Sequence, residues 1–163
     1  MPLVTGLRWR QGYGNSNPPP FEEQIETNSQ NTVVGELVTG VVGFVSKRVA
    51  AAELVLGIAD IPGWNNANSQ TLGLKARYQP VILNAVYMVS ISNAGNVANI
   101  AQANLFVAYG LIESLVEVDK WVVNNADVAT PKVKIIGFVD PVGTPHGRVL
   151  VQFLAIAIQS IVV

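Results

Sequence analysis

Cysteine is absent from this chain of 163 residues, and histidine occurs once, as His146. Without cysteine there are no disulfides, thiolate zinc sites, iron–sulfur clusters or cysteine nucleophiles. Charged residues make up only 13% of the chain, against a usual share of about 25%. The formal net charge of −1 provides no long-range field to attract nucleic acid or anionic lipid. We therefore expect no nucleic acid and no membrane among its partners.

Hydrophobic residues, in contrast, account for 50% of the chain. A chain of this length forms one domain with a sizeable core. Its 10 basic and 11 acidic side chains are few to cover the remaining surface, and monomers normally keep exposed apolar patches small. We therefore expect part of the apolar surface to be buried against other subunits or a larger assembly.

No segment has the pattern of an export signal or a membrane span. The N-terminal residues 1–6 lack an apolar core region. The C-terminal run Val149–Val163 contains only 15 residues and is interrupted by two glutamines and a serine, whereas a span needs about 20 apolar residues. The expectation is a soluble protein.

Composition divides the chain into an N-terminal arm, residues 1–32, and a body, residues 33–163. Only eight of the 32 arm residues are hydrophobic, and Pro18-Pro19-Pro20 favours an extended backbone. One interpretation is a disordered tail, and the other is a strap that docks on a neighbouring subunit. The candidate contact residues of such a strap are three aromatic and two basic side chains: Trp9, Tyr13, Phe21, Arg8 and Arg10.

The body is rich in β-branched residues, because the chain holds 26 valines and 12 isoleucines, which favour strands. Two stretches, Ser46–Leu56 and Asn96–Val107, could be helical, but neither is long enough to change the class. The pattern predicts an all-β fold, a small β-barrel with an extended N-terminal arm. The expected strands are Gly35–Val45, Leu54–Ala59, Val81–Leu83, Tyr87–Ile91, Leu111–Val118, Trp121–Asn124, Val133–Val139 and Arg148–Val163.

No catalytic constellation is found in the sequence. His146 lies between glycines and a proline, which predicts an exposed turn, and no nucleophile motif accompanies it. Glu113 and Glu117 would share one face of a strand; a paired acid–base site is conceivable there, but a solvated strand edge is the favoured interpretation. Neither a calcium loop nor a phosphate-binding loop is present. We expect no enzyme, and no catalytic, cofactor-binding or metal-binding residue.

The order of the body's short hydrophobic segments carries a resemblance. The segments are Gly35–Val38, Ala52–Ala59, Trp121–Val123, Val133–Phe138 and Gly147–Leu154. Over about residues 35–155 the chain resembles the capsid decoration (cement, head-stabilising) proteins of tailed bacteriophages.

The resemblance implies a β-barrel or β-tulip domain that assembles as a homotrimer on the outer surface of the mature head. There it would bind the major capsid protein and cement neighbouring capsid subunits against the pressure of packaged DNA. Such proteins often extend a terminal arm to a neighbouring decoration trimer or to the shell. The family has no catalytic residues to carry over.

A second function remains open, a phage fibre-like or glycan- or ligand-binding β-barrel module. Aromatic side chains clustered on body loops would favour it. Trp64, in Pro62-Gly63-Trp64-Asn65-Asn66, is the one good candidate in the sequence, and it could equally cap the trimer or the end of the barrel.

Overall fold

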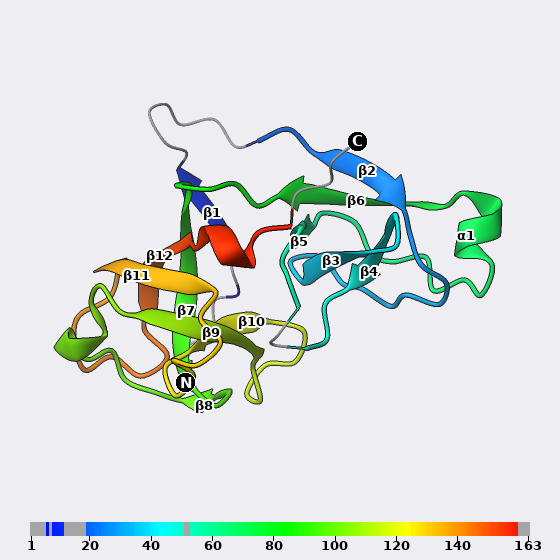
Figure 1. Cartoon of the computed structure of the whole chain (residues 1–163). Coiled ribbons are helices and arrows are strands. Elements are labelled where there is room, and N and C mark those ends of the chain that lie inside the picture. Colours follow the sequence, from blue (N-terminus) through cyan, green and yellow to red (C-terminus); the bar gives the residue numbers. More distant parts are fainter. Residues whose placement is uncertain (1–5, 7, 12–18, 51–52, 160–163) are drawn as a thin grey trace.

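The computed structural model describes residues 6, 8–11, 19–50 and 53–159, and it is nearly all β. Among the described residues, twelve strands and three single-turn helices follow one another, and Figure 1 shows their arrangement. The strands are β1 (Arg8–Gln11), β2 (Glu22–Ile25), β3 (Leu37–Val41), β4 (Phe44–Lys47), β5 (Gly57–Ala59), β6 (Lys75–Pro80), β7 (Val86–Asn93), β8 (Asn96–Val97), β9 (Ala108–Glu113), β10 (Trp121–Asn124), β11 (Val133–Phe138) and β12 (Arg148–Phe153). The helical turns are α1 (Ser69–Leu72), η1 (Gln102–Asn104) and η2 (Ala155–Ala157).

The larger unit is a closed five-stranded barrel with the strand order β7-β10-β9-β11-β12, in which β12 pairs back onto β7. All of these pairings are antiparallel except β10 with β7. Along β12, Val149, Val151 and Phe153 alternate with less buried residues, as expected for a strand with one face toward a core. The predicted all-β barrel class is therefore confirmed.

The smaller unit, which we call the first lobe, is an antiparallel sheet in the order β2-β6-β5-β3-β4. Its two end strands meet again, because Glu26 forms a parallel bridge with Val45. In Figure 1 the first lobe lies beside the barrel. One core cluster spans both units, since Leu37, Val55 and Ile58 of the first lobe pack with barrel residues such as Tyr87 and Trp121. A smaller cluster fills the first lobe alone.

Several strand limits differ from the expectation. The segment expected as one strand, Gly35–Val45, is a hairpin that reverses at Val42 and Gly43, both with positive φ. The chain over Val81–Leu83 is a loop, and the last predicted strand ends at Phe153, before η2. The described residues of Ser46–Leu56 form no α-helix, and Asn96–Val107 contains the short strand β8 and the single turn η1.

Nineteen of the 32 residues of the N-terminal arm have a described position. Strand β2 pairs with β6, and the backbone amide of Thr27 donates to the Val45 carbonyl at 2.8 Å. The side-chain amide oxygen of Gln30 accepts from the Lys47 amide at 2.8 Å. Residues 22–30 are thus joined to the first lobe, and the expected strap concerns the residues before Glu22.

Candidate functional site

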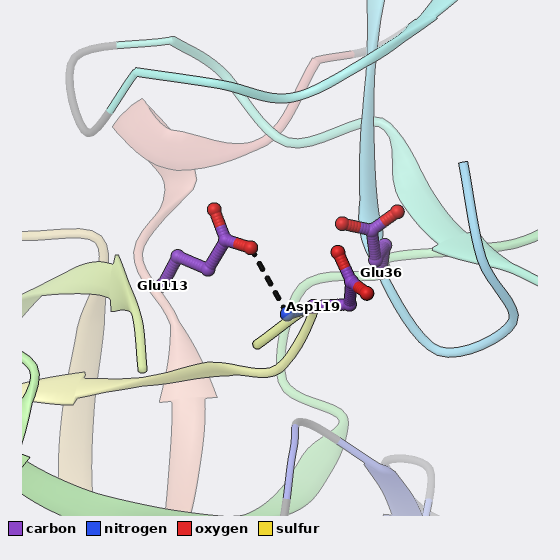
Figure 2. A group of neighbouring side chains, drawn as sticks. All are labelled: Glu36, Glu113 and Asp119. Carbon is purple, nitrogen blue, oxygen red and sulfur yellow. Dashed lines mark hydrogen bonds between the residues drawn. The ribbon is translucent and has the colours of Figure 1, made fainter. Parts of the chain in front are cut away.

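A cluster of four charged side chains links the first lobe to the barrel. Glu36 immediately precedes β3, Lys47 ends β4, Glu113 ends β9 and Asp119 lies in the loop between β9 and β10. One oxygen from each carboxylate lies within 4.8 Å of the other two. Figure 2 shows the three carboxylates, with the backbone amide of Asp119 donating to Glu113 Oε1 at 3.0 Å.

Lys47 supplies the positive charge of this cluster. Its Nζ lies 2.6 Å from Glu36 Oε1 and 3.4 Å from Asp119 Oδ1. Glu36 is fully buried, and its other oxygen accepts a hydrogen bond from the Val33 amide at 2.7 Å. Burial raises the pKa of Glu36, although Lys47 and Val33 favour the charged form.

For Lys47 the balance of effects is reversed. Burial acts to lower its pKa, but the hydrogen bond and attraction to Glu36, together with the hydrogen bond to Asp119, outweigh it and raise the pKa. The ammonium group of Lys47 stays protonated and lies between the carboxylates of Glu36 in the first lobe and Asp119 in the barrel. The cluster therefore contains its own cation, and its chemistry is that of an ionic link between the first lobe and the barrel.

His146 does not have the exposed position that the sequence predicts. Its side chain is buried, its φ is +48°, and neither ring nitrogen has a hydrogen-bond partner among the described residues. The reason is that the loop after β11 folds onto the segment before η1, where the His146 amide donates to the Ala98 carbonyl at 2.8 Å. An imidazole without an orienting carboxylate or a neighbouring nucleophile has none of the contacts that a general base uses.

Glu113 and Glu117 do not form the carboxylate pair that a shared strand face would allow. Strand β9 ends at Glu113, and Glu117 lies in the following loop, where it forms an ion pair with Lys120. Glu113 instead accepts the Asp119 amide. Polar loop contacts, in which Ser114 Oγ accepts from the Glu117 amide at 3.2 Å, turn the chain out of the strand.

Arg48 and Trp121 form a buried contact that the sequence analysis missed. The guanidinium carbon of Arg48 lies 4.2 Å from the centre of the Trp121 ring, and both side chains are almost fully buried. Arg48 Nε donates to the Glu53 carbonyl at 3.1 Å. Burial lowers the pKa of Arg48 to about 10. Residue types alone gave no signal for this contact, because Arg48 and Trp121 are far apart in the chain.

The predicted arm residues occupy three different situations. Arg8, Trp9 and Arg10 belong to β1, whose backbone pairs with β7, Arg8 opposite Met88 and Trp9 opposite Tyr87. Tyr13 lies outside the described residues. Phe21 is 53% exposed, and the guanidinium carbon of Arg77 lies 5.4 Å from the centre of its ring.

Strand β1 occupies a particular place on the barrel. One edge of β7 pairs with β12, while the other pairs with β10 only at Ile91 and Ser92. Strand β1 pairs with the part of that second edge from Val86 to Met88. The arm thus supplies backbone hydrogen bonds to part of a strand edge that the barrel leaves open.

No protein family, curated protein or solved structure matches the chain. Within the described ranges, no helix has the length and apolar character needed to cross a membrane. Function is therefore inferred from the surface and contacts of the chain.

Proposed function

We propose that the protein is a structural virion protein that decorates the outside of a mature phage head. In this role a homotrimer binds the major capsid protein and cements neighbouring capsid subunits against internal DNA pressure. In this role the protein acts by binding capsid subunits, without catalysis. The location on the head and the trimeric state rest on the resemblance of the hydrophobic segments to those of capsid decoration proteins. The exposed apolar side chains support a role in binding other subunits.

The observation that carries the proposal is the apolar surface. Eighteen large hydrophobic side chains are exposed among the described residues, on both lobes, including Val42 at 92%, Val118 at 74% and Phe106 at 64%. Single exposed hydrophobic residues are ordinary, but this chain has only 21 charged residues to keep such a surface soluble. Burial of these side chains against neighbouring subunits accounts for both facts.

The arm adds a second route of attachment. Strand addition provides affinity through backbone hydrogen bonds and requires little side-chain specificity. The segment that joins β1 to β2 contains two glycines and three prolines. In the proposed assembly, aromatic side chains of the arm contact an adjacent decoration trimer or the shell, while β1 keeps its pairing with β7. Ligands that bind only the assembled shell stabilise it by mass action.

The test adds purified protein to undecorated mature heads and to procapsids, and images both by electron microscopy. We expect binding to mature heads at three-fold and quasi-three-fold positions, with higher resistance of those heads to heat. Binding to neither particle would contradict the proposal, as would a monomer in sedimentation velocity at micromolar concentration.

The arm is tested separately with a variant in which Trp9, Tyr13 and Phe21 are replaced by alanine. Its control is Gln102→Ala, which removes an exposed polar side chain from the barrel instead. We expect the arm variant to bind heads more weakly while the barrel stays folded. Equal occupancy of both variants would remove the arm from the mechanism and leave the decoration role to the body.

A further inference from the structure

The loop Pro62–Asn66 is held in place by the segment 26–32. The Gly63 amide donates to the Thr32 carbonyl and the Asn65 amide to the Gln30 carbonyl, both at 2.8 Å. A Cβ atom on Gly63 would lie 2.6 Å from the Gln30 carbonyl oxygen, so only glycine fits at this point. The loop is thus packed backbone to backbone against its neighbour.

A buried carboxylate holds the centre of this loop. Glu26 is 1% exposed, and its two oxygens accept the Trp64 amide at 3.0 and 3.2 Å. Burial raises the pKa of Glu26, against the hydrogen bonds from Trp64 and Ser69. A buried carboxylate is costly unless its partners are well placed, so Trp64 has a defined backbone position.

Trp64 is nevertheless 54% exposed. Its only polar atom, Nε1, already donates to the Lys75 carbonyl at 2.9 Å. The exposed part is therefore the apolar ring surface, with its orientation set by the chain itself. An aromatic ring that is fixed in this way loses little conformational entropy when a ligand stacks on it.

The loop of Trp64 and the helical turn that follows it carry several uncharged polar side chains. Residues 61–74 contain no charged side chain, and Asn65, Asn68 and Thr71 are exposed. Each amide offers both donors and acceptors. An aromatic ring on a segment that carries amide and hydroxyl groups matches a ligand with a C–H face and several hydroxyl groups.

We propose that Trp64 and the amide side chains of its loop form a saccharide-binding subsite for neutral sugars of a glycan. A pyranose ring would stack its C–H face on the indole, while its hydroxyl groups would hydrogen-bond to the amides. This goes beyond the decoration role and does not depend on it, because it needs no contact between the protein and a shell.

The test uses the three tryptophan indole N–H signals in ¹H–¹⁵N correlation spectra of the full chain, the Trp64 signal being assigned from its loss in Trp64→Phe. The probes are maltoheptaose, cellohexaose, chitohexaose and a mannose oligosaccharide. We expect at least one probe to shift the Trp64 signal and leave the buried Trp121 signal in place. Trp64→Ala should weaken that binding about tenfold, and Asn68→Ala should weaken it less.

The control for this test is Phe106→Ala. It removes an exposed aromatic residue from the barrel, and the variant should bind the same saccharide as strongly as the parent protein. Absence of any shift with all four probes would overturn the proposal. So would a result in which Trp64→Ala leaves saccharide binding unchanged but abolishes self-association or binding to heads, because the ring would then be a protein contact.

Discussion

Lys47 Nζ lies 2.6 Å from Glu36 Oε1 within the first lobe and reaches Asp119 of the barrel at 3.4 Å. The lysine side chain is 15% exposed and the glutamate is not exposed at all. One ammonium group therefore compensates a buried charge and links two units at the same time. Removing one partner of such a pair leaves the other charge buried, which costs more than the pair itself contributes.

Lys47→Met is expected to lower the free energy of unfolding by about 3 kcal/mol at neutral pH, because Glu36 then lacks its cation. The loss should shrink at pH 4, where Glu36 is protonated. The double variant Glu36→Gln/Lys47→Met removes both charges and should lose less than Lys47→Met alone. Urea unfolding at both pH values measures this, and an equal loss at both would contradict it.

The raised pKa of Glu36 also predicts that the stability of the wild-type protein depends on pH. Its pKa is higher in the folded chain than the ordinary value of 4.5, so folding favours its protonated form. The stability that Glu36 contributes is thus fully present below about pH 4.5 and is lost as the pH rises through the higher folded value. The unfolding free energy of the native chain, relative to Glu36→Gln, should fall from pH 4 to pH 7. A flat difference would contradict this.

The all-β class of the fold was predicted from the sequence more accurately than the ends of the strands or the contacts between side chains. Strand β10 was predicted with its observed bounds because Trp121–Asn124 is an apolar run between a charged pair and a turn. Strand β6 was missed because Lys75, Arg77 and Pro80 give its sequence no apolar run, although Tyr78 within it is buried. The residue pattern shows which residues favour a strand. The hairpin turn at Val42 and Gly43 was missed because valine rarely adopts the positive φ that it has there.

The polar contacts were harder to predict for a related reason. His146 was expected in an exposed turn because glycine and proline surround it, and only the packing of that loop against Ala98 buries it. Lys47 and Asp119 lie 72 residues apart, and Arg48 meets Trp121 over a similar separation. Long-range contacts of this kind leave no local spacing in a single sequence.

Removal of residues 1–11 is expected to open the edge of β7 from Val86 to Met88. The unpaired backbone groups should lower the unfolding free energy by about 1–3 kcal/mol and promote association through the open edge. Hydrogen exchange should accelerate at the amides of this edge. Removal of residues 1–5 alone keeps β1 and is the control. Equal protection of the β7 amides in both truncations would show that β1 contributes nothing to this edge.

Arg48→Lys is expected to destabilise the chain by about 2 kcal/mol despite the retained charge. Lysine lacks the planar guanidinium that covers the Trp121 ring and the Nε–H that bonds the Glu53 carbonyl. The fluorescence of Trp121, read in a Trp9→Phe/Trp64→Phe background, should change with this substitution. Lys134→Arg is the control, since Lys134 Nζ lies 5.9 Å from the centre of the Phe106 ring and both residues are exposed, where such a contact contributes little. A stability equal to that of the parent would contradict the prediction.

Gly57→Ala is expected to lower stability by about 1–3 kcal/mol. A Cβ atom at residue 57 would lie 2.5 Å from both the Gln79 carbonyl oxygen and the Tyr78 ring, where β5 pairs with β6. The carbonyl is backbone and cannot rotate away, so the two strands must separate. Gly137→Ala on β11 is the matched control, because the nearest atom to its Cβ would be a leucine methyl carbon at 3.6 Å. Thermal unfolding of both variants decides the matter: if Gly57→Ala melts at the same temperature as Gly137→Ala, the close approach of β5 to β6 is not a packing constraint in solution.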